Sequence, residues 1–195
     1  MRYVKIVGLL LAAGSASRFG SDKLLHLLPD GMPIAVTSAR HLLAAVPECV
    51  AIVRSLAHPL ADKLRDAGCR VEECARADQG MGATLACAVL AAGPGCGYLV
   101  ALADMPFIRP STILAVREAM ESGAKLVAPY FRARRGHPVG MAAEFYEQLV
   151  ALQGDAGARA VLEANAGELR KIPCGDIGVL RDIDTPGDLT PPLVV

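Results

Sequence analysis

The residues of this sequence that most clearly suggest chemistry lie in one loop near its start, which reads LAAGSASRFGSDK. Ala12, Ala13 and Gly14 carry almost no side chain, so backbone N–H groups in this segment can approach a ligand closely. Successive N–H groups in a turn form a concavity that binds anions. Arg18 and Lys23 follow; an arginine can fork two phosphate oxygens and a lysine adds a compact charge. The loop therefore predicts a site for the phosphates of a nucleotide.

Two familiar phosphate-binding fingerprints do not describe this loop. The dinucleotide pattern G-x-G-x-x-G is absent, and the segment from Gly14 to Gly20 lacks the Gly-Lys-Ser/Thr ending of a P-loop. A turn of small residues with two surface cations is the simpler alternative, because Gly and Ser are common in turns. The loop alone leaves this alternative open.

Two aspartates are expected to end strands and to complete a metal site. Asp104 follows the apolar run 98–102, and Asp184 closes the apolar run 179–183. Open α/β sheets bind ligands at the carboxyl ends of their strands, and Mg²⁺ on phosphate oxygens needs only one or two carboxylates. The pair therefore predicts Mg²⁺, although each aspartate alone also fits a turn or a helix cap. Asp182 would point to the same side of the strand, where we interpret it as a charge at the rim.

The elements that must position these residues alternate between short apolar runs and longer helical segments. This alternation is typical of βαβ units, so we expect one domain, residues 1–195, with a three-layer α/β/α Rossmann-like fold and a mainly parallel sheet. The predicted strands are 6–11, 50–53, 70–73, 98–102, 126–128, 138–141 and 179–183. The predicted helices are 34–46, 59–67, 81–92, 111–122, 142–152 and 158–165.

Composition excludes several classes of protein. Hydrophobic residues make up 53% and charged residues 21%, which excludes a disordered or collagen-like chain. The 20 basic and 20 acidic residues are scattered, so no basic stripe is available for nucleic acid or for an anionic membrane. No two cysteines show the spacing of a zinc knuckle or a redox motif, and we expect reduced, mostly packed thiols. The six cysteines are Cys49, Cys69, Cys74, Cys87, Cys96 and Cys174.

The first residues resemble a signal peptide, because Arg2 and Lys5 precede an apolar run that ends in small residues. The run 4–11 also fits a buried parallel strand, and the polar residues after it have a chemical use. No apolar run reaches the length of a membrane helix. We therefore expect a cytoplasmic protein without membrane contact.

With these motifs in place, the chain resembles the molybdenum cofactor nucleotidyltransferases, and within them the cytidylyltransferase branch. The resemblance covers nearly the whole chain. The motifs that carry it are LAAGSASRFG with Lys23 and Leu24 following, GMGATL from Gly80, ADMP from Ala103, RRGHPV from Arg134, GDAGAR from Gly154 and DIDTPGDL from Asp182. The first motif marks only the wider class, whereas the ordered set is more specific.

The resemblance implies a Rossmann-like fold and the Mg²⁺-dependent transfer of a cytidylyl group from CTP to the molybdenum cofactor, with release of pyrophosphate. By resemblance, the nucleotide would be held by Leu11, Ala12, Ala13, Gly14, Gly80, Thr84 and Asp104. The catalytic cations on the triphosphate would be Arg18 and Lys23, and the metal ligands would be Asp104 and Asp184. The pterin substrate would be held by Arg135, Gly136, His137, Pro138, Asp155 and Arg159.

Cytosine is favoured over guanine by one residue, because Ala13 stands where the guanylyl-transferring branch typically has a second glycine. The chain also departs from the branch, which puts base contacts and pterin fit in doubt more than triphosphate chemistry. The departures are Cys74 where asparagine is frequent, Ala83 and Thr84 where two serines are usual, and Gly140 and Met141 where bulky apolar residues are usual.

Other functions remain open from the sequence. A guanylyltransferase using GTP and a cytidylyltransferase for another small phosphate are the nearest enzymes. A non-catalytic carrier of molybdenum cofactor is the alternative of a different class. A molybdoenzyme or its chaperone is a further possible partner. His137 either orders a substrate loop or transfers a proton, and a phosphate nucleophile that is already ionised does not require a base.

Overall fold

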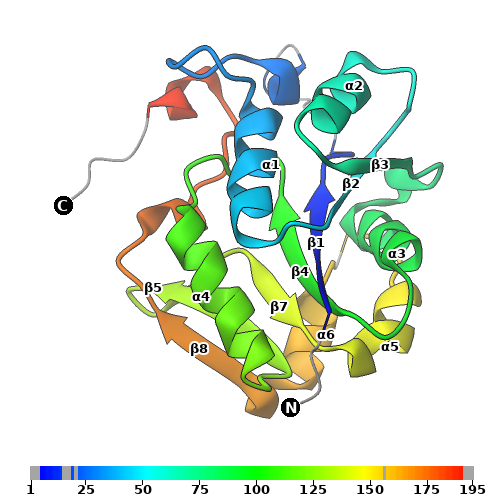
Figure 1. The fold of residues 1–195 in the computed structure, drawn as a ribbon, viewed down its shortest axis with the longest axis vertical. Coiled ribbons are helices and arrows are strands. Elements are labelled where there is room, and N and C mark those ends of the chain that lie inside the picture. Colours follow the sequence, from blue (N-terminus) through cyan, green and yellow to red (C-terminus); the bar gives the residue numbers. More distant parts are fainter. Residues whose placement is uncertain (1–4, 15–18, 20–21, 156, 191–195) are drawn as a thin grey trace.

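A computed structural model describes residues 5–14, 19, 22–155 and 157–190 of the chain. Its centre is one sheet of eight strands in which neighbours follow the order β3-β2-β1-β4-β7-β5-β6, with β8 paired to β5 (Figure 1). The strands are β1 Ile6–Leu11, β2 Cys49–Val53, β3 Arg70–Glu73, β4 Gly97–Leu102, β5 Leu126–Phe131, β6 Arg134–Arg135, β7 Val139–Met141 and β8 Leu169–Pro173. The described sheet therefore matches the predicted α/β class.

The parallel part of the sheet is built from runs of apolar residues. β1 pairs in parallel with β2 on one side and β4 on the other, and β2 pairs in parallel with β3. Strands buried on both faces are apolar at successive positions rather than at alternate ones. β1 shows this pattern, since Val7, Leu9 and Leu10 have no exposed surface. The run that resembled a signal peptide thus supplies the central strand.

Helices cover both faces of the sheet, as Figure 1 shows. The helices are α1 Ile34–Ala45, α2 Pro59–Asp66, α3 Met81–Ala92, α4 Pro110–Glu121, α5 Tyr146–Val150 and α6 Arg159–Ala164. Buried residues of α1, α2 and α4 share one hydrophobic cluster with Leu10 of β1. Those of α3, α5 and α6 share the other cluster with Leu9 and Leu11. Successive strand residues point to opposite faces, so the sheet separates two cores and the fold has three layers.

The second half of the sheet differs from the sequence prediction at three places. Residues 179–183 do not form a strand; the 3₁₀ helix η5 Ile177–Leu180 precedes an irregular segment there. Two strands were not predicted: the two-residue β6, and β8, whose sequence LRKIP is exposed at three of its five positions. Val179 and Ile183 are fully buried, but as packing residues of the hydrophobic core. The apolar run 179–183 thus predicted the burial of Val179 and Ile183 correctly, but its assignment to a strand was wrong.

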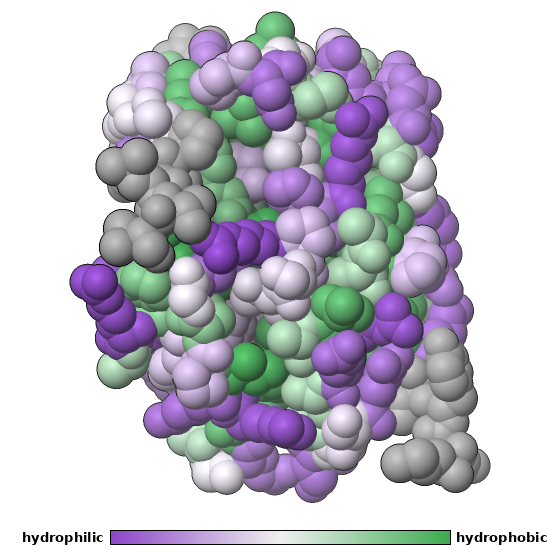
Figure 2. All heavy atoms as spheres, turned by 60° about the vertical axis from the view of Figure 1, so that its left-hand side comes forward, coloured by the Kyte–Doolittle hydropathy of each residue, from purple (hydrophilic) through white to green (hydrophobic). Residues whose placement is uncertain are grey.

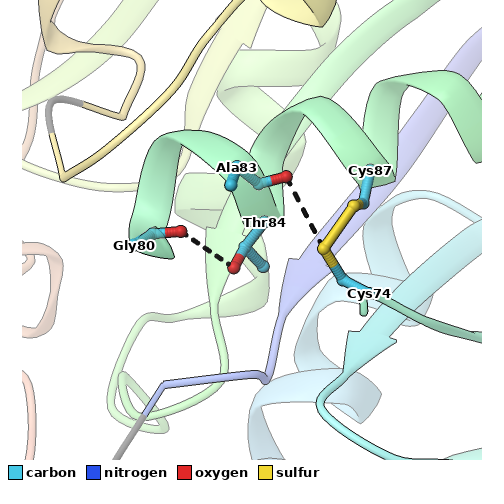
Figure 3. The surroundings of a disulfide bond; sticks show 5 residues. All are labelled: Cys74, Gly80, Ala83, Thr84 and Cys87. Carbon is cyan, nitrogen blue, oxygen red and sulfur yellow. Dashed lines mark hydrogen bonds between the residues drawn. A yellow bond between two sulfur atoms is a disulfide. The ribbon is translucent and has the colours of Figure 1, made fainter. Parts of the chain in front are cut away.

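The prediction of reduced thiols is wrong for one pair, because Cys74 and Cys87 form a disulfide with Cα atoms 5.9 Å apart (Figure 3). The bond joins the residue after β3 to the middle of α3. Their separation of 13 residues matches no motif, so only the packing of α3 against the strands brings them together. Cys49, Cys69, Cys96 and Cys174 are free.

The surface mixes residues of both kinds. On the face drawn in Figure 2, hydrophilic and hydrophobic residues are interspersed. Exposed large hydrophobic residues such as Leu27, Leu56 and Leu90 come from separate elements. Among the described residues, none of the helices is long and apolar enough to cross a membrane.

Candidate nucleotide and metal site

A cavity of about 420 Å³ opens at the carboxyl edge of the parallel strands. Residues at the end of β1, at the start of α3 and just after β4 line it. Ala103 N–H donates to the Leu11 carbonyl at 3.1 Å and Ala12 N–H donates to the Ile52 carbonyl at 2.9 Å, so the ends of the three central strands stay joined beyond the sheet. The cavity therefore lies at the edge where parallel sheets bind ligands.

Most residues predicted to bind the nucleotide meet in this cavity. Its lining includes Leu11, Ala13, Gly14, Gly80, Thr84 and Asp104. Ala12 faces the other core and lines a neighbouring cavity of about 300 Å³. Arg18, the predicted catalytic arginine, lies outside the described residues. The roles of these residues stay predictions, but three separate segments of the chain, at 11–14, 80–84 and 104, do converge.

Lys23 lies at the start of the 3₁₀ helix η1 Lys23–Leu25 and points between two aspartates. Its Nζ is 2.9 Å from Oδ2 of Asp104 and 3.3 Å from Oδ1 of Asp184, and its side chain is only 11% exposed. Burial alone would lower the pKa of the Lys23 ammonium, but hydrogen bonds and attraction from Asp104 and Asp184 outweigh burial and raise the pKa. Lys23 is therefore held charged between the two predicted metal ligands.

A third carboxylate belongs to this cluster. Ligand oxygens of Asp104, Asp182 and Asp184 all lie within 4.8 Å of one another. Carboxylates at this spacing, together with phosphate oxygens, fit a hard divalent cation such as Mg²⁺. Asp182 had been interpreted as a rim charge; it is exposed, but it stands close enough to share a cation. The expectation that Asp182 and Asp184 lie on the same side of the chain therefore holds, although their segment is irregular rather than a strand.

Hydrogen bonds from separate elements fix the two sides of the carboxylate cluster. Ile183 N–H donates to the Asp104 carbonyl at 2.9 Å, which ties the two segments directly. The buried Ser38 hydroxyl of α1 donates to the Ala103 carbonyl at 2.9 Å. Asp188 accepts from Thr185 N–H at 2.8 Å and from its hydroxyl at 2.7 Å, which lowers the pKa of Asp188 and closes the turn after Asp184. The carboxylate cluster is therefore positioned by hydrogen bonds of the surrounding segments as well as by the ion pairs of Asp104 and Asp184 with Lys23.

The GDAGAR segment packs against the start of α3. Gly82 N–H donates to the Gly154 carbonyl at 2.6 Å, and a Cβ on Gly82 would stand 2.7 Å from the Gln153 carbonyl oxygen. Only a glycine permits this approach. The Thr84 hydroxyl donates to the Gly80 carbonyl at 3.2 Å, as Figure 3 shows. Of the segment's predicted substrate residues, Asp155 lines the cavity, whereas Arg159 is exposed and pairs with Glu163 at 2.6 Å.

The RGHPV segment is held by its backbone and does not line the cavity. Gly136 N–H donates to the Pro129 carbonyl at 2.8 Å and His137 N–H to the Val179 carbonyl at 2.9 Å. The bond between His137 and Pro138 is cis. A Cβ on Gly136 would stand 2.5 Å from atoms of Val179, so close packing requires glycine there. Arg135 lies in β6 and is exposed.

The environment of His137 keeps its ring neutral. Burial, and then the charge of Arg135, lower the pKa of His137 to about 4, against the raising effects of a hydrogen bond to the Val100 backbone and of the Asp182 charge. Its Nδ1 is buried and has no hydrogen-bond partner within the described part of the chain. At neutral pH His137 is therefore an uncharged side chain behind the carboxylate cluster.

Two cavity residues were not found from the sequence. Arg54 follows β2 directly, and Asp78 lies in the 3₁₀ helix η2 Ala77–Gln79 before α3. The rule that used strand ends to select Asp104 applies equally to Arg54, since 50–53 was predicted as a strand. Asp78 gave no such signal, because its segment showed no periodic pattern.

Comparisons with known proteins agree with this geometry. The family described as the MobA-like NTP transferase domain matches residues 8–170. A curated relative, nicotine blue oxidoreductase of Paenarthrobacter nicotinovorans, is 27% identical over 188 residues, which cover 92% of each chain.

Two solved structures share the fold along nearly the whole chain. A nucleotidyl transferase from Methanothermobacter thermautotroptrophicus has a TM-score of 0.78 at 22% identity and covers 94% of both chains. Rv0371c of Mycobacterium tuberculosis H37Rv has a TM-score of 0.77 at 21% identity, covering 95% of this chain and 96% of its own. A complex of Rv0371c with manganese has a TM-score of 0.68 at 19% identity, covering 89% of this chain and 93% of its own.

Because the family match spans well over half of the sequence, the chain belongs to the MobA-like NTP transferase domain family, a family of nucleotidyltransferase enzymes.

Proposed function

We propose that the protein transfers a cytidylyl group from CTP to the terminal phosphate of molybdopterin-bound molybdenum cofactor and releases pyrophosphate, with Mg²⁺ as the metal. The observation that carries the transfer chemistry is the position of Lys23 between Asp104 and Asp184, beside a cavity lined by the small-residue loop. A divalent metal is typical of this family, and the related Rv0371c has been solved with manganese. The acceptor and the base rest on the ordered sequence motifs.

The chemistry needs positioning and charge stabilisation rather than a nucleophilic side chain. An acceptor phosphate oxygen attacks the α-phosphorus, the bond from that phosphorus to the bridging oxygen breaks, and pyrophosphate leaves with the electron pair. Lys23 and the loop N–H groups would stabilise the charge that grows on the leaving phosphates. Asp104 and Asp184, with Asp182 beside them, would hold the metal, which supplies charge neutralisation on the phosphate oxygens. Arg18 remains the second proposed triphosphate ligand.

The choice of CTP is supported by the placement of Ala13. Its methyl group belongs to the cavity lining on the α3 side, where the loop and the start of α3 face each other. A glycine there would leave more room for a base, so the methyl group favours a pyrimidine over a larger purine. Thr84 and Gly80 lie on the opposite wall, at the distance of one helical turn from each other.

The acceptor is proposed to approach from the side of Asp155 and the RGHPV segment. Asp155 lies in the cavity wall, and exposed Arg134 and Arg135 form β6, where two cations can attract an anionic phosphate. His137, Pro138 and Gly136 would then shape this side through backbone packing rather than through direct contact.

An oxidoreductase is the second candidate, because the curated relative carries that name. The Lys23 and aspartate cluster favours phosphate chemistry, since a hydride or electron transfer does not require a cation between carboxylates. The two candidates separate in one experiment that measures both products.

The test is pyrophosphate release by purified protein with Mg²⁺ and mature molybdenum cofactor, run in parallel with CTP, GTP and ATP. We expect release with CTP that depends on both the metal and the acceptor. Release with GTP alone would reassign the base. Tight cofactor binding with no release from any nucleotide would identify a carrier. Oxidation of a reduced nicotinamide cofactor with nicotine blue as acceptor, again without pyrophosphate, would identify an oxidoreductase.

A further inference from the structure

Arg54 occupies a position at the cavity that the transfer chemistry does not use. It follows β2, and the parallel register that pairs Leu11 with Ile52 places Arg54 beside Ala13, just beyond the sheet. The Arg54 Nη2 donates to the Ala13 carbonyl at 3.1 Å. The residue thus touches the backbone of the small-residue loop at the position proposed to select the base.

The charge of Arg54 is distinctive at this cavity. The charged side chains among its described lining residues are Arg54, Asp78, Asp104 and Asp155, so Arg54 is the single cation in that set. A guanidinium carries five N–H donors in a fixed plane. One donor on Ala13 leaves the others able to bind acceptor atoms of a ligand.

The order of the strands in the sheet indicates which part of a bound nucleotide would lie near Arg54. β1 lies between β2 and β4, so Arg54 and Asp104 stand on opposite sides of the β1 loop. Lys23 and the carboxylate cluster gather on the β4 side, where the triphosphate and its metal belong. The nucleoside end must then extend away from that cluster, toward β2 and the start of α3. Arg54 faces this end.

We propose that Arg54 is a specificity-determining residue, which fixes the loop at Ala13 with one N–H group and donates another to a carbonyl oxygen of the bound base. Cytosine and guanine both carry such an oxygen, at different distances from the ribose, so a fixed donor selects between them. The inference rests on the proposed nucleotide function and adds the residue that reads the base.

Calorimetric binding tests this role by comparing ligands with and without a nucleoside. CTP, 2′-deoxy-CTP, GTP and inorganic tripolyphosphate, each with Mg²⁺, are titrated into the native protein and into Arg54→Ala and Arg54→Lys. Arg170→Ala, a change to an exposed arginine on β8 at the other end of the sheet, is the matched control. Thermal unfolding of each variant reports whether it is folded.

We expect Arg54→Ala to weaken CTP binding by about 10- to 100-fold, the range for loss of one hydrogen bond to a charged donor. Tripolyphosphate binding should change less than about twofold, and the ratio of CTP to GTP affinity should fall. Arg54→Lys should recover part of the loss, because an ammonium can reach one acceptor without the planar fork. Arg170→Ala should match the native protein.

Four results would overturn the proposal. Equal losses for CTP and tripolyphosphate would place Arg54 on the phosphates, and a loss for CTP that is absent for 2′-deoxy-CTP would place it on the ribose. Unchanged CTP affinity in a folded Arg54→Ala variant would leave only a packing role. If the native protein bound tripolyphosphate but no nucleoside triphosphate, the proposed function itself would fail, and the role of Arg54 with it.

Discussion

The proposed nucleotide side and the proposed acceptor side of this protein are built differently. On the proposed nucleotide side, Ala13, Arg54 and Asp104 lie one or two positions beyond the ends of parallel strands, where they line one cavity. On the proposed acceptor side, RGHPV runs from Arg135 of β6 to Val139 of β7, and both strands pair antiparallel to β5. Its Gly136 and His137 use their backbone groups to hold neighbouring segments.

The difference is expected to separate residues that would contact a ligand from residues that shape the protein around the cavity. Side chains just beyond the ends of parallel strands contribute little to the packing of the core. Substitution of these side chains should therefore affect activity more than stability. A glycine packed against Val179, or a buried neutral His137, contributes mainly to packing. We therefore expect substitutions on the proposed nucleotide side to change mainly the activity, and substitutions on the proposed acceptor side to change mainly the free energy of unfolding.

The largest effect should come from Lys23→Ala. Loss of one preorganised cation at the leaving phosphates should lower turnover by about 100- to 1000-fold, by analogy with loss of one electrostatic donor in other enzymes. Pyrophosphate release under saturating CTP measures it. Lys63→Ala, a change to an exposed lysine of α2, is the control. A decrease in turnover of less than tenfold would exclude Lys23 from the mechanism. The contrast between an activity-determining nucleotide side and a structural acceptor side would then lose its main support.

The three carboxylates should rank by their contact with Lys23. Asp104→Asn and Asp184→Asn should each lower turnover by about 100-fold or more, because both lose a charge in the cluster that Lys23 joins. Asp182→Asn should cost less than about tenfold, since Asp182 is exposed. Turnover measured across a Mg²⁺ titration gives the ranking. An Asp182 effect as large as that of Asp184 would make all three carboxylates equal metal ligands.

Removal of the Cys74–Cys87 disulfide should destabilise the wall of the nucleotide cavity. A bond that closes a loop of about 15 residues stabilises a protein by about 3 kcal/mol. The Cys74→Ser, Cys87→Ser variant should lose a free energy of unfolding of this order in urea. A reducing agent should lower the stability of the native protein and leave the variant unchanged, with Cys174→Ser as the control for a free thiol. Equal stability of the oxidised and reduced protein would contradict this role.

On the acceptor side, Gly136→Ala should lower the free energy of unfolding by about 1–3 kcal/mol, because its Cβ would overlap Val179. CTP affinity of the folded fraction should stay within about twofold of native. Gly167→Ala is the matched control, since no described atom lies within 4 Å of the position of its Cβ. Weaker CTP binding in a stable Gly136→Ala variant would place RGHPV at the nucleotide after all.

The last comparison concerns the pH dependence of stability through His137. Its folded pKa of about 4 lies below the ordinary 6.5, so between these values the unfolded chain binds a proton that the folded protein does not. The stabilisation is fully present above pH 6.5 and declines as the pH falls toward 4, by at most about 1.4 kcal/mol per unit. Urea unfolding across this range should show a shallower slope for His137→Asn. An identical slope would mean that other groups set the acid sensitivity.

The sequence predicted the parallel core, and the position of several proposed nucleotide residues at one edge of the sheet, because those features depend on local patterns. Apolar runs ended at small or acidic residues, and the rule for strand ends placed Ala13 and Asp104 correctly at the cavity. The strand β8 was missed because a partly exposed strand carries charges at positions where the pattern expects apolar residues. Asp182 and the Cys74–Cys87 pair depend on contacts between distant segments, for which the sequence alone offers no spacing rule.

The ammonium of Lys23 has one more consequence when it is set against the whole carboxylate cluster. Among the described residues, Lys23 pairs with Asp104 and Asp184, and a ligand oxygen of Asp182 lies within 4.8 Å of theirs, so the negative charges of this cluster outnumber its positive one. A bare triphosphate approaching this group would be repelled, whereas a triphosphate that already carries a divalent cation brings its own compensating charge. If the cavity takes a triphosphate as proposed, this charge balance would favour entry of the metal complex of the nucleotide over entry of the bare triphosphate.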